Sequence, residues 1–287
     1  MKTLRTLLVS SRPLSWVNTA YPFAAAYLLT AGQIDLAWIV GTLYFLVPYN
    51  LAMYGINDVF DYESDLRNPR KGGVEGAVLE RSMHRTTLLA AVATNVPFLA
   101  VLVLLGGPLS WLVLAISILA VIAYSAPGLR FKERPFLDSA TSSTHFVSPA
   151  LYGLVLAQAD FTPALWALLG SFFLWGIASQ AFGAVQDVVA DREGGIASIA
   201  TVTGASATVR FAIAAYLLGG ALMLFTPWPG PLAALLVLPY VLNIVPFASL
   251  KDDDAEFAHR GWERFLWLNY VTGFFVTMLL IWYATIR

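Results

Sequence analysis

The stretch "GINDVFDYESDLRNPRKGG", residues 55–73, gathers charge in a chain that is otherwise strongly apolar. Carboxylate and amide side chains fill its first half, and arginine and lysine follow directly. The whole chain of 287 residues is 58% hydrophobic and 12% charged, with no cysteine and a formal net charge of -1. An apolar share above the roughly 45–50% of soluble domains predicts a membrane protein. The absence of cysteine excludes disulfides and thiol catalysis. We also expect no nucleic-acid partner.

The apolar segments outside this stretch have the length of transmembrane helices. A helix needs roughly 20 mostly apolar residues to cross a bilayer. Nine segments meet this requirement: 14–31, 36–57, 86–105, 108–126, 139–158, 162–186, 206–226, 231–249 and 265–286. Glycine and proline at 106–108 and 227–231 mark tight turns between neighbouring segments. We therefore predict an all-α membrane protein of nine transmembrane helices that forms a single domain over residues 1–287.

The distribution of cationic side chains predicts the orientation of these helices. By this segmentation, 16 of the 17 lysine and arginine residues lie on the side of the N-terminus, and only Arg287 lies on the other. The positive-inside rule then places the N-terminus in the cytoplasm and the C-terminus outside, across the cell membrane. Of the 18 acidic residues, only Asp35 and Asp160 fall on the outer side. Chemistry that needs charge is therefore expected at the cytoplasmic side.

The acidic stretch is expected to continue the second apolar segment as a helix until Pro69, because proline ends helices. Asn57, Asp61 and Asp65 then follow an i, i+4, i+8 spacing and share one helical face over about 12 Å. Tyr54 extends this face one turn toward the membrane. Three oxygen-bearing side chains in a row suit a hard divalent cation such as magnesium, which often shares its coordination with phosphate. The alternative interpretation is a solvated network of ion pairs.

A second acidic stretch weakens that alternative. "AFGAVQDVVADREGG", residues 181–195, closes the sixth apolar segment and carries Asp187 and Asp191 four residues apart, with Arg192 beside them. Both acidic stretches are predicted on the cytoplasmic side. Two such clusters are able to clamp a diphosphate through two metal ions, while neighbouring cations bind the remaining oxygens.

The two stretches "NDVFDYESD" and "DVVAD" resemble the paired NDxxDxxxD and DxxxD motifs of the UbiA superfamily of intramembrane prenyltransferases. "SRPLSW" at the first segment and "YSAPGLRFKERPFLDS" after the fourth extend the resemblance over essentially the whole chain. The resemblance implies helices around a central cavity, in which an isoprenyl group passes from its diphosphate to an apolar acceptor with the help of Mg2+. It implies nothing about protein partners.

The resemblance also implies roles for individual residues. One magnesium ion would be bound by Asn57, Asp61 and Asp65, and the other by Asp187 and Asp191. Asp61 and Asp187 would be central to catalysis. Residues that would contact the diphosphate are Arg67, Arg70, Arg130 and Lys132. Asp58 and Tyr54 would orient the metal ligands without binding the metal themselves. Many relatives carry a lysine or arginine after the second motif, where this chain has "GGIASIATVTG". One phosphate contact would then be either missing or supplied by Arg192.

Within the superfamily, the chain is most similar to the lycopene elongase branch of carotenoid biosynthesis, through "DYESDLRNPRKGGVEGA", the "QD" and "DREGGI" of the second motif, and "SSTHFVSPALYG". That similarity implies dimethylallyl diphosphate as donor and the end groups of lycopene as acceptor. Alkylation of an alkene leaves a tertiary cation that loses a proton or gains water. His145, inside the fifth segment, is a candidate proton acceptor, because ionisable residues within membrane spans are often functional. The alternative is a neutral histidine that only packs.

Other functions stay open at this point. A prenyltransferase of the same family could act on an aromatic quinone precursor, a chlorophyll precursor or a glycerol-phosphate lipid. A transporter with buried carboxylates is the alternative from another class. Transporters place their charges near the middle of the bilayer on broken helices, whereas both acidic stretches here are predicted at cytoplasmic helix ends.

Overall fold

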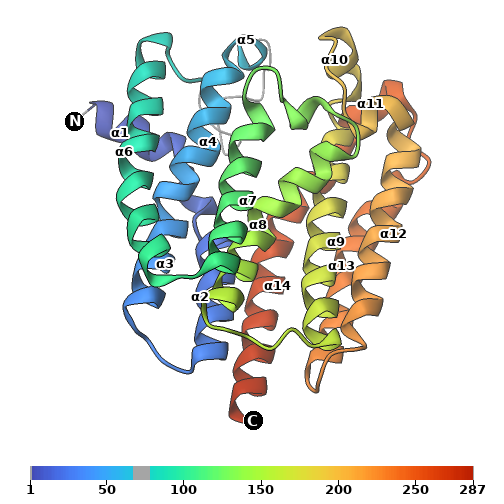
Figure 1. The fold of residues 1–287 in the computed structure, drawn as a ribbon. Helices are drawn as coiled ribbons and strands as arrows, with labels where there is room; N and C mark the ends of the chain where they lie inside the picture. Colours follow the sequence, from blue (N-terminus) through green and yellow to red (C-terminus); the bar gives the residue numbers. More distant parts are fainter. Residues whose placement is uncertain (1, 67–77, 287) are drawn as a thin grey trace. The chain divides into compact units, whose positions relative to one another are not determined.

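A computed structural model describes residues 2–66 and 78–286, and within these ranges the secondary structure consists of helices joined by turns and loops, without strands (Figure 1). The chain divides into two compact units. Unit 1 consists of Met1–Phe131 and His145–Ala159, and unit 2 of Lys132–Thr144 and Asp160–Arg287. The helix α8, Leu137–Leu156, belongs to both units.

The other helices of unit 1 are α1 (Lys2–Ser10), η1 (Pro13–Ser15), α2 (Val17–Ala31), α3 (Leu36–Leu46), α4 (Pro48–Phe60), α5 (Tyr62–Asp65), α6 (Arg81–Leu105) and α7 (Pro108–Ser125). The others of unit 2 are α9 (Pro163–Val185), α10 (Val188–Glu193), α11 (Ile199–Thr203), α12 (Ala205–Met223), η3 (Gly230–Val237), α13 (Leu238–Ile244), η4 (Val245–Phe247), η5 (Asp252–Ala258) and α14 (His259–Thr285). The short helix η2 (Phe131–Glu133) joins them.

Seven helical stretches of the described chain are long and apolar enough to cross a membrane: Leu36–Phe60, Arg81–Leu105, Pro108–Ser125, Pro163–Val185, Ala205–Met223, Gly230–Phe247 and Asp252–Thr285. The chain is thus an all-helical integral membrane protein. Two of the nine predicted segments fall outside this set, for different reasons. α2 has only 15 residues, a length of about 22 Å at 1.5 Å per residue. α8 has 20 residues but carries polar side chains from Asp138 to Ser148.

The predicted segment 36–57 is a helix with a break. α3 ends at Leu46 and α4 starts at Pro48, because proline has no N–H for the helix and fits best at its first position. Backbone groups at such a break need partners inside a membrane. The amide of Asn50 donates to the carbonyls of Phe45 (2.8 Å) and Leu46 (3.1 Å). Asn95 of α6 donates to the carbonyl of Pro48 (2.7 Å), which ties α6 to the break.

Each unit has an apolar core that contains buried aromatic rings. In unit 1 the core includes Phe23, Tyr44, Phe45, Tyr49 and Tyr152. At the start of α3, the backbone N–H of Trp38 donates to the carboxylate of Asp35, which caps the helix and lowers the pKa of Asp35. In unit 2 the core lies between α9, α12, α13 and α14 and includes Phe182, Tyr216, Tyr240 and Phe265.

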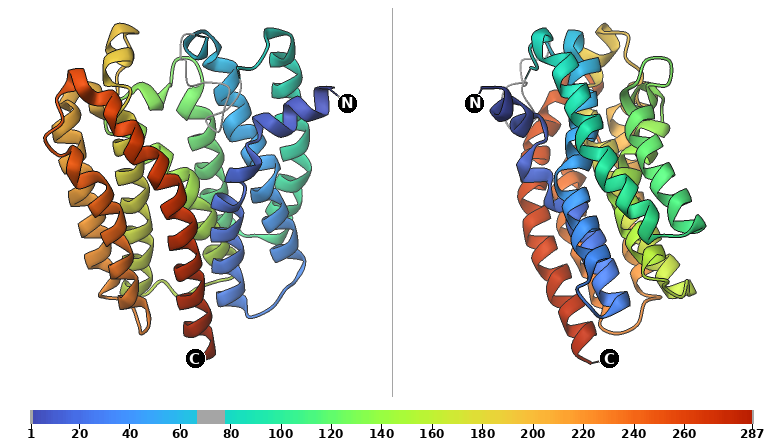
Figure 2. Two further views of the ribbon diagram at one scale, coloured as in Figure 1. Left: turned by 180° about the vertical axis from the view of Figure 1, so that it is seen from behind. Right: turned by 60° about the vertical axis from the view of Figure 1, so that its left-hand side comes forward.

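In unit 1, the first acidic stretch lies at one end of the helices. α1 is turned sideways from α2 and lies at the end where α4 passes into α5 (Figures 1 and 2). In unit 2, α10 and α11 lie at one end and the C-terminus of α14 at the other (Figure 1). Each unit therefore presents one acidic stretch at a single end of its helices.

Candidate active site

The first acidic stretch is not the continuous helix that the sequence predicts. α4 ends at Phe60, and Asp61 adopts φ -97° and ψ 0° before α5 begins. This conformation belongs to the sparsely populated bridge region, where many active-site residues are found. The expectation of an unbroken helix to Pro69 is therefore wrong. Aspartate favours such turns because its side chain competes with helical hydrogen bonds. The helix-like bond from the Asp61 N–H to the Asn57 carbonyl (2.9 Å) is retained.

The second acidic stretch repeats this arrangement in unit 2. α9 ends at Val185, and Asp187 takes φ -100° and ψ -2° before α10. The backbone N–H of Asp191 donates to the carbonyl of Asp187 at 2.8 Å, which keeps the two residues one helical turn apart. In both units, a long apolar helix stops just before an aspartate, and a short helix carries the next acidic residue of the motif.

Asp58 is held by the N-terminal part of the chain. Its buried carboxylate, 1% exposed, accepts a hydrogen bond from the Ser10 hydroxyl (2.8 Å) and another from the Arg12 guanidinium (3.1 Å). Arg12 also lies over the ring of Tyr54, 4.3 Å from its centroid. We call Ser10, Arg12, Tyr54 and Asp58 the N-terminal clasp. It fixes the last two turns of α4, which carry the first motif.

Asn57 and Asp61 each meet a side chain from the "YSAPGLRFKERPFLDS" stretch. The Ser125 hydroxyl, at the end of α7, donates to Oδ1 of Asn57 at 2.8 Å. The guanidinium of Arg130 lies 3.7 Å from a carboxylate oxygen of Asp61, which is 6% exposed. The main chain at Arg130 has φ 39°, a left-handed conformation that bends the chain after α7. The first motif thus brings together an amide oxygen, a carboxylate and a cation within one unit.

Ser10, Arg12 and Ser125 were not among the site residues predicted from the sequence. All three lie inside the segments that carry the resemblance, "SRPLSW" with the residue before it and "YSAPGLRFKERPFLDS". The polar residues of those segments were the feature of the sequence from which a role at the site could have been inferred. Their partners could not be assigned, because Ser10 and Arg12 lie 48 and 46 residues from Asp58 along the chain.

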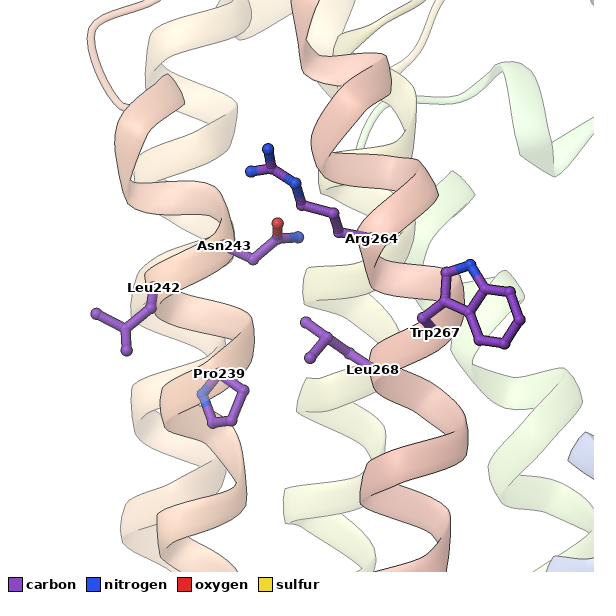
Figure 3. A pocket seen from close by; sticks show the side chains of 6 residues that line it. All are labelled: Pro239, Leu242, Asn243, Arg264, Trp267 and Leu268. Carbon is purple, nitrogen blue, oxygen red and sulfur yellow. The ribbon is translucent and has the colours of Figure 1, made fainter.

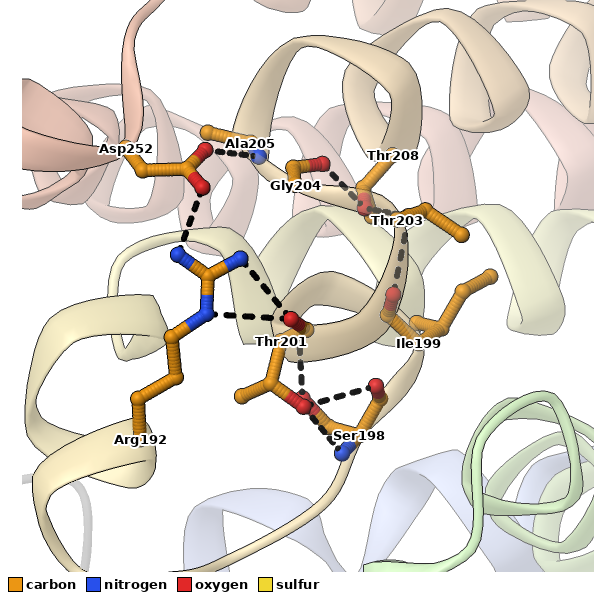
Figure 4. A network of polar contacts seen from close by, with 9 residues as sticks. All are labelled: Arg192, Ser198, Ile199, Thr201, Thr203, Gly204, Ala205, Thr208 and Asp252. Atoms are coloured by element: carbon orange, nitrogen blue, oxygen red, sulfur yellow. Dashed lines mark hydrogen bonds and ion pairs between the residues drawn. The ribbon is translucent and has the colours of Figure 1, made fainter.

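Arg192 occupies the centre of a polar network in unit 2 (Figure 4). Its guanidinium donates to the carbonyl of Thr201 through Nε (3.0 Å) and Nη2 (2.8 Å), and to the carboxylate of Asp252 through Nη1 (2.6 Å). The other oxygen of Asp252 accepts from the backbone N–H of Ala205 at 2.7 Å. Arg192 thereby ties α10 to α11 and, through Asp252, to the start of α12, with three of its five N–H donors engaged within the protein.

Asp138 joins the start of α8 to the segment that follows the second motif. Its carboxylate is 1% exposed and accepts the backbone N–H groups of Ser139 (2.6 Å) and Ile199 (2.9 Å). Ile199 is the first residue of α11, where N–H groups lack partners in the helix itself. Asp138 therefore holds α11 in place.

His145 is buried in α8, and its ring meets the ring of Tyr124 edge to face, with centroids 5.2 Å apart.

Among the other predicted residues, Lys132 lies in η2, at the start of unit 2. Asp65 is the last residue of α5. Arg67 and Arg70 lie outside the described residues.

The oxygen ligands fit a hard cation, since an amide oxygen and carboxylates are what magnesium takes in proteins. Within residues 2–66 and 78–286, no three His, Cys, Asp or Glu side chains form a group that holds a metal ion. A pocket of about 460 Å³ lies in unit 2 between α13 and α14 (Figure 3). It is lined by Pro239, Leu242, Asn243, Arg264, Trp267 and Leu268. None of the predicted site residues lines it.

Comparison with known proteins agrees with these features. The sequence pattern of the UbiA prenyltransferase family matches residues 19–269, and the chain belongs to this family of membrane prenyltransferases. It is 56% identical over 281 residues to a lycopene elongase/hydratase of Corynebacterium glutamicum, which covers 98% of each chain. It is 60% identical over 280 residues to the C(50) beta-cyclic carotenoids biosynthesis protein LbtBC of a Dietzia strain, which covers 97% of this chain and 65% of that protein.

The fold is also similar to solved structures. A UbiA homolog from Archaeoglobus fulgidus bound to DMAPP and Mg2+ superposes with a TM-score of 0.70 over 93% of this chain and 98% of that one, at 17% identity. The same homolog has been solved with GPP and Mg2+, with a TM-score of 0.69 at 18% identity. At these identities the likeness establishes a shared fold.

Proposed function

We propose that this chain transfers a dimethylallyl group from dimethylallyl diphosphate to the end groups of lycopene, in a magnesium-dependent reaction. The observation that carries the proposal is the repeated acidic turn, Asp61 in unit 1 and Asp187 in unit 2, at the end of an apolar helix in a prenyltransferase of the UbiA family. The names of its relatives, lycopene elongase/hydratase among them, support lycopene as acceptor.

The metal ligands follow from the two motifs. Asn57, Asp61 and Asp65 bind one magnesium ion, and Asp187 and Asp191 bind the other. Ser125 orients the amide of Asn57, so that Oδ1 is the atom presented to the metal. When bound, magnesium neutralises charge on the departing diphosphate.

Cationic side chains bind the diphosphate oxygens directly. Arg130, beside Asp61, is the best supported of them. Lys132, Arg67 and Arg70 belong to the same set. A guanidinium binds phosphate through two parallel donors, which fixes both the position and the orientation of the donor substrate. We also keep Arg192 in this set: three of its five N–H donors bond Thr201 and Asp252, and its side chain is 43% exposed.

We also propose that the chain crosses the cell membrane nine times, with α2 and α8 as the two crossings beyond the seven long apolar stretches. Polar side chains of α8 bond within the protein, as Ser143 does to the carbonyl of Phe173 (2.7 Å), so these side chains do not have to face lipid. The cationic loops place the N-terminus and both acidic motifs at the cytoplasmic side.

Expression in a host that makes lycopene, followed by mass spectrometry of its carotenoids, tests the proposal. Wild type should yield products heavier by one or two five-carbon units. Asp61→Ala and Asp187→Ala should yield none, because each loses a metal ligand. Asp160→Ala removes a carboxylate from the loop before α9 and should elongate lycopene as wild type does.

Two results would contradict different parts of the proposal. Elongation by purified Asp61→Ala in the presence of a metal chelator would refute the role of magnesium. The wild-type protein could instead leave lycopene unchanged and prenylate an aromatic or glycerol-phosphate acceptor in isolated membranes. That result would refute lycopene as the acceptor, while the proposed prenyl transfer would stand.

A further inference from the structure

A buried group of polar side chains lies among apolar helices in unit 1. Ser117 of α7 and Ser148 of α8 share a hydrogen bond of 2.6 Å, and Ser117 donates another, of 3.3 Å, to the hydroxyl of Tyr49 in α4. The Tyr49 hydroxyl in turn donates to the backbone carbonyl of His145 at 3.4 Å. All four residues are at most 4% exposed. We call Tyr49, Ser117 and Ser148 the hydroxyl cluster.

His145, whose backbone carbonyl accepts the hydrogen bond from Tyr49, also has one ring nitrogen that bonds nothing among the described residues. The backbone carbonyl of Ala120 accepts a hydrogen bond from the ring. The ring atom Nε2 is buried and has no hydrogen-bond partner among the described residues. A neutral imidazole that donates from Nδ1 carries a lone pair on Nε2, which accepts a proton or a hydrogen bond. Buried polar atoms are almost always partnered in proteins, so an unused basic nitrogen points to a partner that arrives with the reaction.

We propose that His145 and the hydroxyl cluster bind the water molecule that ends the reaction, and that Nε2 of His145 accepts its proton. This inference rests on the proposed function, in which the allylic group adds to a terminal double bond of the acceptor and leaves a tertiary carbocation. The oxygen of the water forms a bond to the cationic carbon. One O–H bond of that water breaks, its proton passes to Nε2, and the product is a tertiary alcohol. His145 later returns the proton to the released diphosphate or to solvent.

The hydroxyl cluster favours water over direct removal of a proton from carbon. A buried water needs two to four polar partners, and removal of a proton from carbon needs only a base. Ser148 follows His145 by three residues in α8, so the two side chains lie on the same helical face about one turn apart. Nε2 and the Ser148 hydroxyl therefore offer a bound water an acceptor and a second partner. Ser117 and Tyr49 fix the orientation of the Ser148 hydroxyl.

The surroundings suit a short-lived cation. The Tyr124 ring packs edge to face against the His145 ring, and the aromatic core of unit 1 lies close by through Tyr49 and Tyr152. Aromatic faces stabilise positive charge without reacting as bases. Among aromatic rings and weakly basic hydroxyls, His145 is thus the side chain that accepts the proton.

The test compares product type with donor consumption. Wild type, His145→Phe, His145→Gln and Ser148→Ala are incubated with lycopene and dimethylallyl diphosphate in water enriched in heavy oxygen. Diphosphate release reports transfer, and mass spectrometry separates the alcohol from the alkene that is lighter by one water. We expect heavy oxygen in the wild-type product. In His145→Phe the ratio of alcohol to alkene should fall by roughly 10²-fold, the scale of a positioned proton acceptor, with a smaller fall in Ser148→Ala.

A control and a second variant keep the outcome clear. Thr144→Ala removes a neighbouring hydroxyl that donates to the Ala140 carbonyl of its own helix, and it should keep the wild-type ratio. If His145→Phe does not fold, His145→Gln keeps a polar side chain of similar length without its basicity and should show the same shift.

An unchanged ratio in a folded, active His145 variant would overturn the inference. So would a wild-type product without heavy oxygen, although the proposed function would then stand. Wild type that forms no elongated product at all would refute both.

Discussion

Arg12→Ala should destabilise the protein and uncouple the N-terminus from the first motif. The substitution removes a hydrogen bond of 3.1 Å to Asp58, a carboxylate that is 1% exposed, and the contact of the guanidinium with the Tyr54 ring at 4.3 Å. A hydrogen bond to a charged group contributes about 1.5–3 kcal/mol, and an exposed cation–π contact about 0.5–1 kcal/mol. Because the Arg12 side chain is only 19% exposed, water replaces these contacts poorly. We therefore expect a loss of about 2–4 kcal/mol.

Thermal unfolding in detergent measures this loss. At about 2 °C per kcal/mol for a chain of this size, the apparent Tm should fall by roughly 4–8 °C. Unfolding of membrane proteins is often irreversible, so all variants are compared at one scan rate. Arg5→Ala, which removes an exposed cation from α1, the helix that precedes Arg12, is the matched control and should change the Tm little.

A double-mutant cycle with Asp58→Asn isolates the contact between the two residues. If Arg12 acts through Asp58, the double variant should lose less than the sum of the single variants, with a coupling free energy of about 1.5–3 kcal/mol. Strictly additive losses would show that Arg12 stabilises the fold by another route, and the reasoning about the N-terminal clasp would then be refuted.

Two further substitutions address the proposed ligands. Ser125→Ala should raise the magnesium concentration for half-maximal turnover roughly 10–100-fold, because it frees the amide of Asn57. A magnesium titration of the turnover rate measures this change. Thr94→Ala is the control, since the Thr94 hydroxyl bonds within its own helix. Arg130→Ala should raise the KM for the donor roughly tenfold or more, since it removes a charge-assisted contact, and should leave the KM for the acceptor nearly unchanged. Initial rates measured at varied concentrations of both substrates give the two KM values. A rise confined to the KM for the acceptor would contradict the assignment.

The sequence was sufficient for the helices and the order of the motifs, because both depend on short-range patterns. Runs of apolar residues predicted segments that the structure shows as helix, and the spacing of the acidic residues placed the motifs at their ends. The geometry at Asp61 and Asp187 could not be predicted in this way. A spacing of four residues is compatible with an unbroken helix and with a turn between two helices, and only the surrounding contacts select the turn.

Contacts between distant parts of the chain were likewise beyond the sequence. Nothing in the order of residues pairs Ser10 and Arg12 with Asp58, or Asp138 with Ile199, because these contacts depend on how helices pack. The same holds for Arg192. Its place beside the second motif made it a candidate for the diphosphate, and nothing in the sequence indicated that its guanidinium also bonds Thr201 and Asp252.

α8 shows why hydropathy is least reliable where function is concentrated. Its serine, threonine, aspartate and histidine side chains lower its apolar character, so it is absent from the seven stretches that qualify as membrane spans. Several of those side chains are buried and bonded, as Ser143 is to a backbone carbonyl in unit 2 and Ser148 is to Ser117 in unit 1. A polar side chain inside a membrane costs free energy unless it is partnered, so each one is retained for structure or chemistry. The helix that resembles a membrane span least is therefore where a catalytic side chain is most to be expected, and His145 lies in it.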